Sequence, residues 1–360
     1  MTTPAPARTR PAAAFHTLTV AAVDHLCEDA AAITFDVPEE LREAYAFRAG
    51  QSLTLRRFVD GEEQRRSYSI CAPAGSAPRI GVREIPDGLF SSWLVREVVP
   101  GTRIEVQAPT GSWRADAAPG ERHLCIAAGS GITPMLSVAS TVLAHPGAQV
   151  SLVYGNRTSR TVMFTEELGD LKNRYGARFQ MVHVLSREPR DVELFSGRLD
   201  RDRLRRLLTD LIPAETFDHV WLCGPLRMIE DARNVLAELA VPATVHVELF
   251  YVDEPPPQPR RAAGAPPGET TELTMVLDGL RTTSTVSRDT TLLEGAQATR
   301  ADLPFACKGG VCGTCRAVVR EGEVDMRRNY ALEPSELDAG FVLTCQSFPV
   351  GESVTIDYDA

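Results

Sequence analysis

The chain contains 360 residues and carries a formal net charge of -10 at neutral pH. This length exceeds what one hydrophobic core usually organises, so we expect two or three domains. The acidic surplus argues against nucleic acid as the main partner, because phosphate binding needs a concentrated basic face. The basic run RDRLRRLL at 201–208 is better explained as the solvated side of a helix.

The N-terminus and the most apolar stretch give no sign of a membrane partner. Residues 1–14 hold two arginines but no apolar core of the kind that a secretory signal needs, so we expect a disordered tail. The stretch at 123–144 could be mistaken for a membrane span, but Gly-Ser-Gly and a proline interrupt it. A cytoplasmic protein also fits four cysteines that are scattered among apolar residues, as reduced thiols usually are: Cys27, Cys71, Cys125 and Cys223.

Residues 15–116 predict an antiparallel β-barrel. Short β-like runs alternate with turn residues, and the Asp-Gly pair of VDGEE at 59–63 is a hairpin signal. Two stretches in this region hold residues suited to a flavin, RRSYSI at 65–70 and DGLFSS at 87–92. An aromatic ring can pack on a flavin, a hydroxyl can bond to its N5 edge, and an arginine can hold its phosphate. An ordinary edge strand could look the same as the first stretch.

In this order the two stretches resemble the ferredoxin-NADP reductase family. Arg66, Tyr68 and Ser69 match the family's Arg-x-Tyr-Ser motif. The second stretch matches its phosphate-holding loop, in which N–H groups and the dipole of the following helix meet the pyrophosphate. The matching residues are Gly88, Leu89, Phe90 and Ser91. The resemblance implies FAD, rather than FMN, in the barrel.

Residues 117–252 predict a second domain, of the doubly wound α/β class. Apolar strands alternate with helical stretches, which is typical of a parallel sheet. AAGSGITPML at 127–136 follows a strand and opens a helix, so its backbone can approach a pyrophosphate closely. The reductase family carries a proline in the same last place of this loop. The residues concerned are Gly129, Gly131, Thr133 and Pro134.

Two later stretches resemble the nicotinamide site of the same family. LCGPLRM supplies Cys223, Gly224, Pro225 and Met228, and VHVELF supplies Glu248 and Phe250. The resemblance implies that Ser69, Cys223 and Glu248 shape the site of hydride transfer. It also implies that Phe250 covers the flavin face on which the nicotinamide stacks. The chain continues past this aromatic residue, which leaves its placement open, and buried filler is the alternative for Cys223.

Basic residues after two strands favour NADPH over NADH. NAD-specific sites commonly end their second strand with an acidic residue on the ribose hydroxyl, whereas a 2'-phosphate needs arginine. Here the second strand runs into Arg157 and Arg160 without an acid. Ser186 and Arg187, after the next strand, match the family's Ser-Arg pair at the 2'-phosphate. Solvated loop arginines are the alternative, which leaves NADH open as the second choice.

Residues 253–270 are rich in proline, alanine and glycine and predict a linker before a last domain at 271–360. If flexible, this linker has a root-mean-square span of roughly 20 to 25 Å, which would let the last domain move. The last domain contains a glycine-rich stretch, CKGGVCGTC, in which backbone N–H groups can turn toward sulfur atoms.

Four cysteines of the last domain have the spacing of plant-type [2Fe-2S] ligands, C-x4-C-x2-C and a distant fourth cysteine. They are Cys307, Cys312, Cys315 and Cys345. Structural zinc is the alternative, but zinc ribbons usually present paired Cys-x2-Cys knuckles, and only one such pair exists here.

The last domain resembles a plant-type ferredoxin, and this resemblance implies a β-grasp fold. The domain holds 14 acidic and 8 basic residues, which would steer it toward a basic docking surface, unless the acidity serves only solubility. The sequence at 307–347, notably EVDMRRNYALE and GFVLTCQS, resembles the reductase subunits of phenylacetyl-CoA 1,2-epoxidases. That resemblance implies a di-iron oxygenase component as the partner that accepts the electrons.

The domain order of barrel, nucleotide sheet and ferredoxin resembles the oxygenase-reductase branch of the ferredoxin-NADP reductase family. It implies that NAD(P)H gives a hydride to FAD and that electrons then pass singly to the cluster, which accepts only one. The alternatives are a reductase for another ring-hydroxylating or steroid oxygenase and a non-catalytic redox sensor. The seven histidines are dispersed along the chain and suggest no metal cluster.

Overall fold

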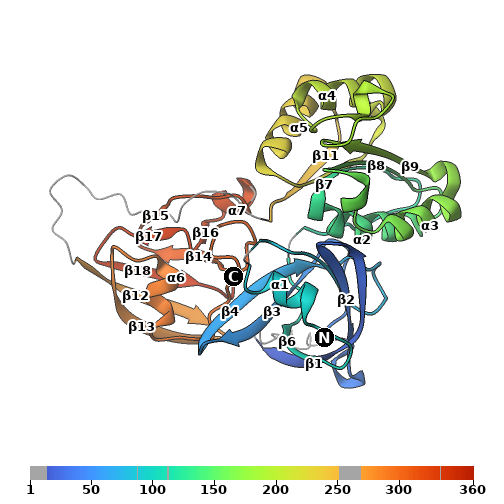
Figure 1. Ribbon diagram of the computed structural model, residues 1–360. Helices are drawn as coiled ribbons and strands as arrows, with labels where there is room; N and C mark the ends of the chain where they lie inside the picture. The colour runs from blue at the N-terminus through green and yellow to red at the C-terminus, as the bar shows by residue number, and fades with distance from the viewer. Residues whose placement is uncertain (1–13, 87, 112, 251–268, 333) are drawn as a thin grey trace, which may run out of the picture. The chain divides into compact units, whose positions relative to one another are not determined.

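The computed structural model describes residues 14–86, 88–111, 113–250, 269–332 and 334–360. The chain divides into two compact units, one of residues 16–252 and the other mainly of residues 253–360 (Figure 1). The predicted tail and the predicted linker lie outside the described residues, except for Ala14, Glu269 and Thr270. Within the described residues, no helix is long and apolar enough to cross a membrane.

The first part of the larger unit is a six-stranded antiparallel sheet in the order β4-β3-β6-β1-β2-β5. An antiparallel bridge between Ile70 and Ile80 joins the end of β4 to β5, so the sheet closes into the predicted barrel. Asp60 and Gly61 have positive φ angles of 51° and 84°, as a two-residue hairpin turn requires, which confirms the predicted hairpin. The elements are β1 (Phe15–Cys27), β2 (Ala30–Asp36), η1 (Glu39–Leu41), β3 (Ser52–Val59), β4 (Glu62–Ser69), β5 (Arg79–Arg83), α1 (Ser91–Arg96) and β6 (Arg103–Gln107).

The second part of the larger unit is a five-stranded parallel sheet in the order β11-β10-β7-β8-β9. Helices α2 and α3 cover one face and α4 and α5 the other, so this is the predicted doubly wound fold (Figure 1). The strands are β7 (Arg122–Ala128), β8 (Gln149–Asn156), β9 (Phe179–Leu185), β10 (His219–Cys223) and β11 (Thr244–Glu248). The helices are α2 (Ile132–Leu143), α3 (Thr165–Tyr175), α4 (Arg201–Arg206) and α5 (Leu226–Glu238).

Short helical turns complete the α/β part. They are η2 (Gly129–Gly131), η3 (Ser159–Thr161), η4 (Gly176–Arg178), η5 (Glu193–Phe195), η6 (Leu207–Leu211) and η7 (Ala214–Thr216). The basic run at 201–208 forms α4 and the start of η6, and its arginines pair with nearby carboxylates such as Glu238, Asp200 and Glu193. This agrees with the prediction of a solvated helix face.

The smaller unit is built on a five-stranded sheet in the order β13-β12-β18-β14-β16 with a separate two-stranded sheet of β15 and β17. Its central pair, β12 and β18, is parallel, and α6 packs against the sheet, which is the β-grasp arrangement expected. The elements are β12 (Thr270–Leu277), β13 (Leu280–Ser287), α6 (Leu292–Gln297), β14 (Arg316–Glu321), β15 (Val324–Met326), α7 (Pro334–Asp338), β16 (Phe341–Leu343), β17 (Ser347–Pro349) and β18 (Ser353–Asp357).

Candidate functional site

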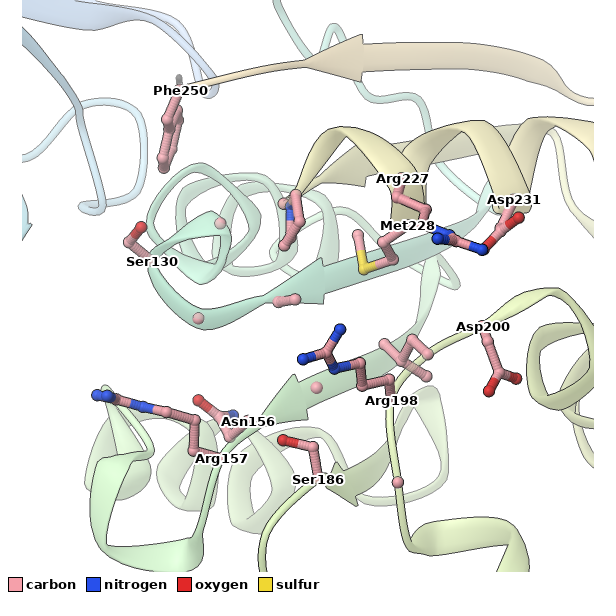
Figure 2. Close-up of a pocket in the computed structure, with 18 of the residues that line it drawn as sticks. Ser130, Asn156, Arg157, Ser186, Arg198, Asp200, Arg227, Met228, Asp231 and Phe250 are labelled. Carbon is pink, nitrogen blue, oxygen red and sulfur yellow. The ribbon is translucent and has the colours of Figure 1, made fainter. Parts of the chain in front are cut away.

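A pocket of ≈ 870 Å³ opens at the carboxyl edge of the parallel sheet (Figure 2). Its walls come mainly from the segments that follow the strands of this sheet, where doubly wound folds bind nucleotides. Phe250 and Ser130 lie at one end of the pocket, and Asp200 and Asp231 lie at the other. Five lining residues are glycines, which leave bare backbone for the close approach of a ligand: Gly129, Gly131, Gly155, Gly197 and Gly224.

The loop after β7 forms the floor of this pocket. Gly129 has a φ of 58°, and a Cβ atom at Gly131 would overlap the carbonyl group of Cys223, so the loop lies directly on the end of β10. Thr133 is buried, and its Oγ1 donates a hydrogen bond to the carbonyl oxygen of Ser130 at 2.9 Å. Pro134 is buried in the first turn of α2. Of the four residues predicted for this loop, the two glycines therefore line the pocket, and Thr133 and Pro134 support it from behind.

The three residues predicted to shape hydride transfer meet in the structure. Ser69, at the end of β4, donates a hydrogen bond from Oγ to Oε2 of Glu248 at 3.3 Å, across 179 positions of the chain. Cys223 is fully buried and is the register partner of Glu248 in the parallel pair β10–β11. Removal from water raises the pKa of the Glu248 carboxyl to about 8, although the Ser69 bond lowers it in part. Burial and the neighbouring Glu248 raise the pKa of the Cys223 thiol, so both groups are neutral at pH 7.

The residues predicted for the flavin come from two barrel segments that touch each other. The Tyr68 and Phe90 rings lie 6.2 Å apart between centroids. A Cβ atom at Gly88 would lie 2.7 Å from Ser91 Oγ and 2.8 Å from the carbonyl oxygen of Ile85, so the loop is tight enough to present bare backbone. Ser91 Oγ accepts a hydrogen bond from the N–H of Ile85 at 3.0 Å.

Two further residues of this set are exposed to solvent. The Arg66 guanidinium donates to the carbonyl oxygen of Arg65 at 2.7 Å and is otherwise on the surface, and Leu89 is 65% exposed. A cationic side chain, an aromatic ring and bare backbone are the groups that a flavin dinucleotide requires. This part of the barrel therefore fits FAD.

The basic residues predicted for the 2'-phosphate are only partly brought together. Arg157 and Ser186 line the pocket, whereas Arg187 is exposed and is not among its described lining residues. Arg160, likewise exposed, is not among them either. Gly224, Pro225 and Met228 line the wall formed by the start of α5, as the nicotinamide prediction implied.

Seven polar lining residues were not among the predicted site residues: Arg83, Ser130, Asn156, Arg198, Asp200, Arg227 and Asp231. The Arg198 side chain points into the middle of the pocket (Figure 2). Arg83 reaches the pocket from the barrel strand β5, and its guanidinium donates to the carbonyl oxygen of Thr161 in the α/β part. No local motif marks Arg83 and Arg198, whereas Asn156 and Arg227 lie beside predicted residues, Arg157 and Met228.

Asp29, in the turn between β1 and β2, holds two of the pocket arginines. Its Oδ2 accepts a hydrogen bond from Arg157 Nη2 at 2.6 Å, and its Oδ1 lies 3.5 Å from Arg83 Nε. These contacts join the barrel to the α/β part. They also place one carboxylate beside two guanidinium groups that face the nucleotide pocket.

In the smaller unit, the four cysteines of the predicted cluster form two contacting pairs. The Cys312 thiol donates to Cys307 and, with the N–H groups of Gly309 and Val311, lowers the pKa of Cys307 to about 5. The Cys315 thiol donates to Cys345 and lowers the pKa of Cys345. The turns between them use residues with positive φ angles, at Lys308 (52°), Gly310 (79°) and Gly313 (65°).

This pairing fits two iron ions better than one zinc ion. A structural zinc site holds four sulfur ligands around one ion, whereas a [2Fe-2S] cluster shares four cysteines between two irons. Here the four cysteines contact one another as two pairs, Cys307 with Cys312 and Cys315 with Cys345. Two pairs of sulfurs surrounded by N–H donors are the ligand set that a [2Fe-2S] cluster needs.

Three histidines that are far apart in the sequence also meet, at the amino edge of the parallel sheet. The rings of His123 and His219 lie 4.9 Å apart, and His219 Nδ1 lies 3.1 Å from His246 Nε2. The ligand atoms of Glu121, His123 and His219 lie within 4.8 Å of one another, as in a metal site. The prediction of dispersed histidines missed this group, because the parallel register of β7, β10 and β11, not the spacing along the chain, brings them together.

Hydrogen bonding argues against a three-ligand metal site in this group. The indole N–H of Trp221 can only donate, and it lies 3.0 Å from His123 Nδ1. The proton of the neutral His123 ring is therefore on Nε2, which lies 3.2 Å from Glu121 Oε2. A metal on Nε2 would force the proton to Nδ1, against the Trp221 N–H. The group is a hydrogen-bonded support for the start of β10.

Three domain families match the chain. Residues 17–115 match the oxidoreductase FAD-binding domain, residues 125–234 the oxidoreductase NAD-binding domain, and residues 275–350 the 2Fe-2S iron-sulfur cluster binding domain. The three matches follow one another in the order of the barrel, the parallel sheet and the β-grasp unit. The protein therefore uses FAD, a nicotinamide nucleotide and a [2Fe-2S] cluster.

Relatives of known function match almost the whole chain. It is 42% identical over 352 residues to a 1,2-phenylacetyl-CoA epoxidase subunit of Escherichia coli (strain K12), covering 96% of this chain and 98% of that relative. It is 32% identical over 352 residues to the ferredoxin reductase component of 3-ketosteroid-9-alpha-monooxygenase from Rhodococcus rhodochrous, covering 95% and 96% of the two chains. The solved phthalate dioxygenase reductase has the same fold, with a TM-score of 0.58 at 21% identity over 95% of this chain and 98% of that one. The chain therefore belongs to the ferredoxin-NADP reductase-like oxygenase reductases, NAD(P)H-dependent oxidoreductases with a C-terminal plant-type [2Fe-2S] ferredoxin domain.

Proposed function

We propose that this reductase delivers electrons from NADPH to a di-iron phenylacetyl-CoA 1,2-epoxidase. The observation that carries the choice of acceptor is the 42% identity to the epoxidase subunit of Escherichia coli, which spans 98% of that relative and includes all three domains. The identity to the steroid monooxygenase reductase is 32% over a similar length, which makes a steroid oxygenase the second candidate.

In this proposal Ser69, Cys223 and Glu248 form the site of hydride transfer. Bound FAD supplies the chemistry that accepts a hydride and releases electrons one at a time. The neutral Cys223 thiol and the neutral Glu248 carboxyl add no anion to the site, and a carboxyl with a pKa near 8 can hold a proton at neutral pH. Ser69 touches Glu248 directly, so a proton can pass between the barrel and the end of β11.

The remaining cofactor contacts are assigned by the same reasoning. Arg66 and the backbone of the loop at 88–91 would hold the FAD pyrophosphate, with Tyr68 and Phe250 on the flavin ring. The loop at 129–131, together with residues 224–228, would hold the nicotinamide nucleotide. The cluster ligands would be Cys307, Cys312, Cys315 and Cys345, supported by their two contacting pairs.

A preference for NADPH is supported by the charge of the nucleotide pocket. Arg157, Arg198 and Arg227 line it, and Ser186 offers a hydroxyl beside them. Guanidinium groups bind a 2'-phosphate by two parallel hydrogen bonds, whereas a ribose hydroxyl gains little from them. Arg187 is the least supported member of the predicted set, because it is exposed and away from the described pocket walls.

Domain limits of 15–116, 117–252 and 271–360, joined by a linker at 253–270, are part of this proposal. They are supported by the change from antiparallel to parallel strands between β6 and β7 and by the division of the chain near Asp253. A cytoplasmic location is proposed as well, because reduced thiols such as Cys71 and Cys125 are buried without disulfide partners.

Anaerobic titration of the purified holoprotein with each nicotinamide tests the electron path. With NADPH the flavin band should bleach first and the cluster bands should follow, at lower concentrations than NADH requires. Flavin bleaching without any change in the cluster bands would contradict the path. Equal half-saturation by NADH and NADPH would contradict the cofactor preference alone.

Reconstitution with purified oxygenase components tests the acceptor. The reductase should support NADPH-dependent turnover of phenylacetyl-CoA by the di-iron epoxidase component, with NADPH oxidation matched to product. The same assay with the 3-ketosteroid oxygenase component distinguishes the second candidate. Turnover of the steroid alone would overturn the proposed acceptor but not the electron path.

A further inference from the structure

We infer that Gln346 is a positioning residue that raises the reduction potential of the [2Fe-2S] cluster, by donating an N–H···S hydrogen bond to Cys345. The inference rests on the proposed ligation of the cluster by Cys345 and goes beyond it, because it assigns the potential to a side chain that is not a ligand. The residue follows the fourth cysteine directly and lies in the turn just before β17.

Gln346 is fully buried, and its amide nitrogen faces three acceptors. Nε2 lies 3.0 Å from the carbonyl oxygen of Lys308, 2.9 Å from the carbonyl oxygen of Cys345 and 3.4 Å from Cys345 Sγ. With the amide turned over, its oxygen would face three acceptors and no donor. The observed orientation is therefore the one that the surroundings support.

The same side chain leaves one polar atom unpaired. Oε1 of Gln346 is buried and has no hydrogen-bond partner among the described residues. A buried carbonyl oxygen without a donor costs stability, and a hydrophobic residue of the same size would avoid that cost. A polar side chain retained at this position points to a use for its N–H groups.

The loop that carries the first cysteines is shaped around Gln346. A Cβ atom at Gly310 would lie 2.9 Å from Gln346 Cγ, and Gly310 has a φ of 79°. Through its bond to Lys308, Gln346 links the turn after Cys307 to the segment that holds Cys345. One side chain therefore contacts both ends of the ligand set.

An N–H donor near a cluster sulfur favours the reduced cluster, because reduction adds negative charge to the iron and sulfur atoms. Hydrogen bonds to the sulfurs are one of the factors that set the potentials of these clusters. One N–H of Gln346 can bind Lys308, and the other can be shared between the carbonyl oxygen and Sγ of Cys345. Loss of this donor should therefore lower the potential and make the cluster a poorer acceptor.

The test uses Gln346→Met in the full-length holoprotein, since methionine has a similar length and no N–H group. The midpoint potential is measured by spectroelectrochemical titration and by the EPR signal of the reduced cluster, after iron and sulfide analysis has shown a full cluster. At a fixed potential the ratio of reduced to oxidised cluster should fall by about tenfold, which for one electron corresponds to about 59 mV.

Gln297→Met is the matched control. Gln297, the last residue of α6, is a second glutamine that contacts the turn after Cys307. Its Oε1 accepts a hydrogen bond from Lys308 Nζ at 3.1 Å, and this described hydrogen bond is to the lysine side chain and not to sulfur. Its substitution should leave the potential unchanged. An equal shift in both variants would overturn the inference, because the effect would then belong to the loop as a whole.

Gln346→Leu decides the case if the methionine variant loses its cluster. Leucine also lacks a donor and adds no charge, so the potential of this variant should fall below that of the wild type. An unchanged potential with an intact cluster in either variant would overturn the inference. If both variants lose the cluster while Gln297→Met keeps it, the role of Gln346 is only to hold the loop, and the inference is overturned. A wild-type protein without a [2Fe-2S] signal would instead contradict the proposed ligands.

Discussion

The hydride site of the larger unit and the cluster loop of the smaller unit differ in how their surroundings shift the pKa values of their side chains. At the first, the full burial of Cys223 and the partial burial of Glu248 raise the pKa of each, so the groups stay neutral. At the second, the thiols of Cys312 and Cys315 and nearby backbone N–H groups donate to Cys307 and Cys345, so the pKa values of these two acceptors are lowered while those of the two donors are raised. Hydrogen-bond donors to sulfur therefore decide the pKa at Cys307 and Cys345, whereas burial decides it at Cys223.

This difference shows that burial alone does not make a cysteine ready to bind a metal ion. Burial raises the pKa of Cys71 to about 12, with a partial offset from Arg79, and that thiol faces the carbonyl oxygen of Arg79. Cys307 is next to a turn with positive φ angles, where successive N–H groups converge on its sulfur. The backbone N–H of Cys71 instead bonds to the carbonyl oxygen of Arg79 at 2.8 Å.

The largest effect is expected from removal of a cluster ligand. Cys312→Ser should abolish reduction of the oxygenase and leave NADPH-ferricyanide activity within about twofold of the wild type, because the hydride site is in a separate compact unit. Steady-state assays with each acceptor measure both activities. Cys27→Ser, which removes a thiol from the larger unit, should retain both. Parallel loss of both activities in Cys312→Ser, with flavin still bound, would contradict the sequential path.

A Cβ atom in the nucleotide loop should have the next largest effect. Gly131→Ala would push the loop off the carbonyl group of Cys223 and lower kcat/KM for NADPH by about 100-fold, since displacements near 1 Å have that cost. Gly169→Ala in α3 is the control, because no atom lies within 4 Å of the position of its Cβ. It should leave the kinetics unchanged and stabilise the fold by about 0.5–1 kcal/mol. Wild-type kinetics in Gly131→Ala would remove this loop from the nucleotide site.

The neutral carboxyl of the hydride site predicts a pH profile. Glu248 with a pKa of about 8 loses its proton as pH rises through that value, so the rate of flavin reduction should fall about tenfold per pH unit above it. Stopped-flow reduction by NADPH measures this rate. Glu248→Gln should be slower at neutral pH but flat above pH 8.

The bond from Ser69 sharpens this test. Because that bond lowers the pKa of Glu248, Ser69→Ala should move the falling limb to higher pH. If the rate of flavin reduction still falls above pH 8 in Glu248→Gln, another group is responsible for the titration. If the pH at which the rate falls does not change in Ser69→Ala, the hydroxyl does not act on the carboxyl.

The smallest effect is expected from the carboxylate beside the pocket arginines. Asp29→Asn should release Arg157 and Arg83 and lower the KM for NADPH by about fivefold, because one unit charge at 4 Å in water is equivalent to about 1 kcal/mol. The KM for NADH should change less, since it lacks the 2'-phosphate. Asp60→Asn, in the exposed hairpin turn, makes the same charge change away from these arginines and should alter neither value. A rise in both KM values would show that Asp29 positions the arginines rather than competing for them.

Much of the fold could be predicted because its signals are local. Asp-Gly pairs at 60–61 and 278–279 mark hairpins, and both adopt the positive φ angles that such turns need. The alternation of apolar strands and helices predicted the parallel sheet of the α/β part. The short pair β15 and β17 was not predicted, since each strand has only three residues.

Residues of the candidate site could be predicted where they belong to a sequence motif, but not where only tertiary packing places them in the site. The glycine loop at 129–131 and the residues at 224–228 line the pocket as expected, and Ser69 meets Glu248. Arg198 and Arg83 were missed, because nothing in their neighbouring residues marks a phosphate contact. Thr133 was expected at the pocket and is instead buried against Ser130 and Gly81, which only the helix orientation decides.

The sequence by itself determined the three domains, their order and the cysteine spacing, because turn chemistry, hydrophobic period and ligand spacing are properties of short segments. Only the tertiary structure decided which side chains meet. The register of the parallel sheet places Cys223 beside Glu248 and places His123, His219 and His246 next to one another. The fold of the barrel places Ser69 at the end of β11. The physical reason is that a side chain's neighbours across a sheet depend on how strands pair, and strand pairing joins positions that are far apart in the sequence, such as His123 and His219.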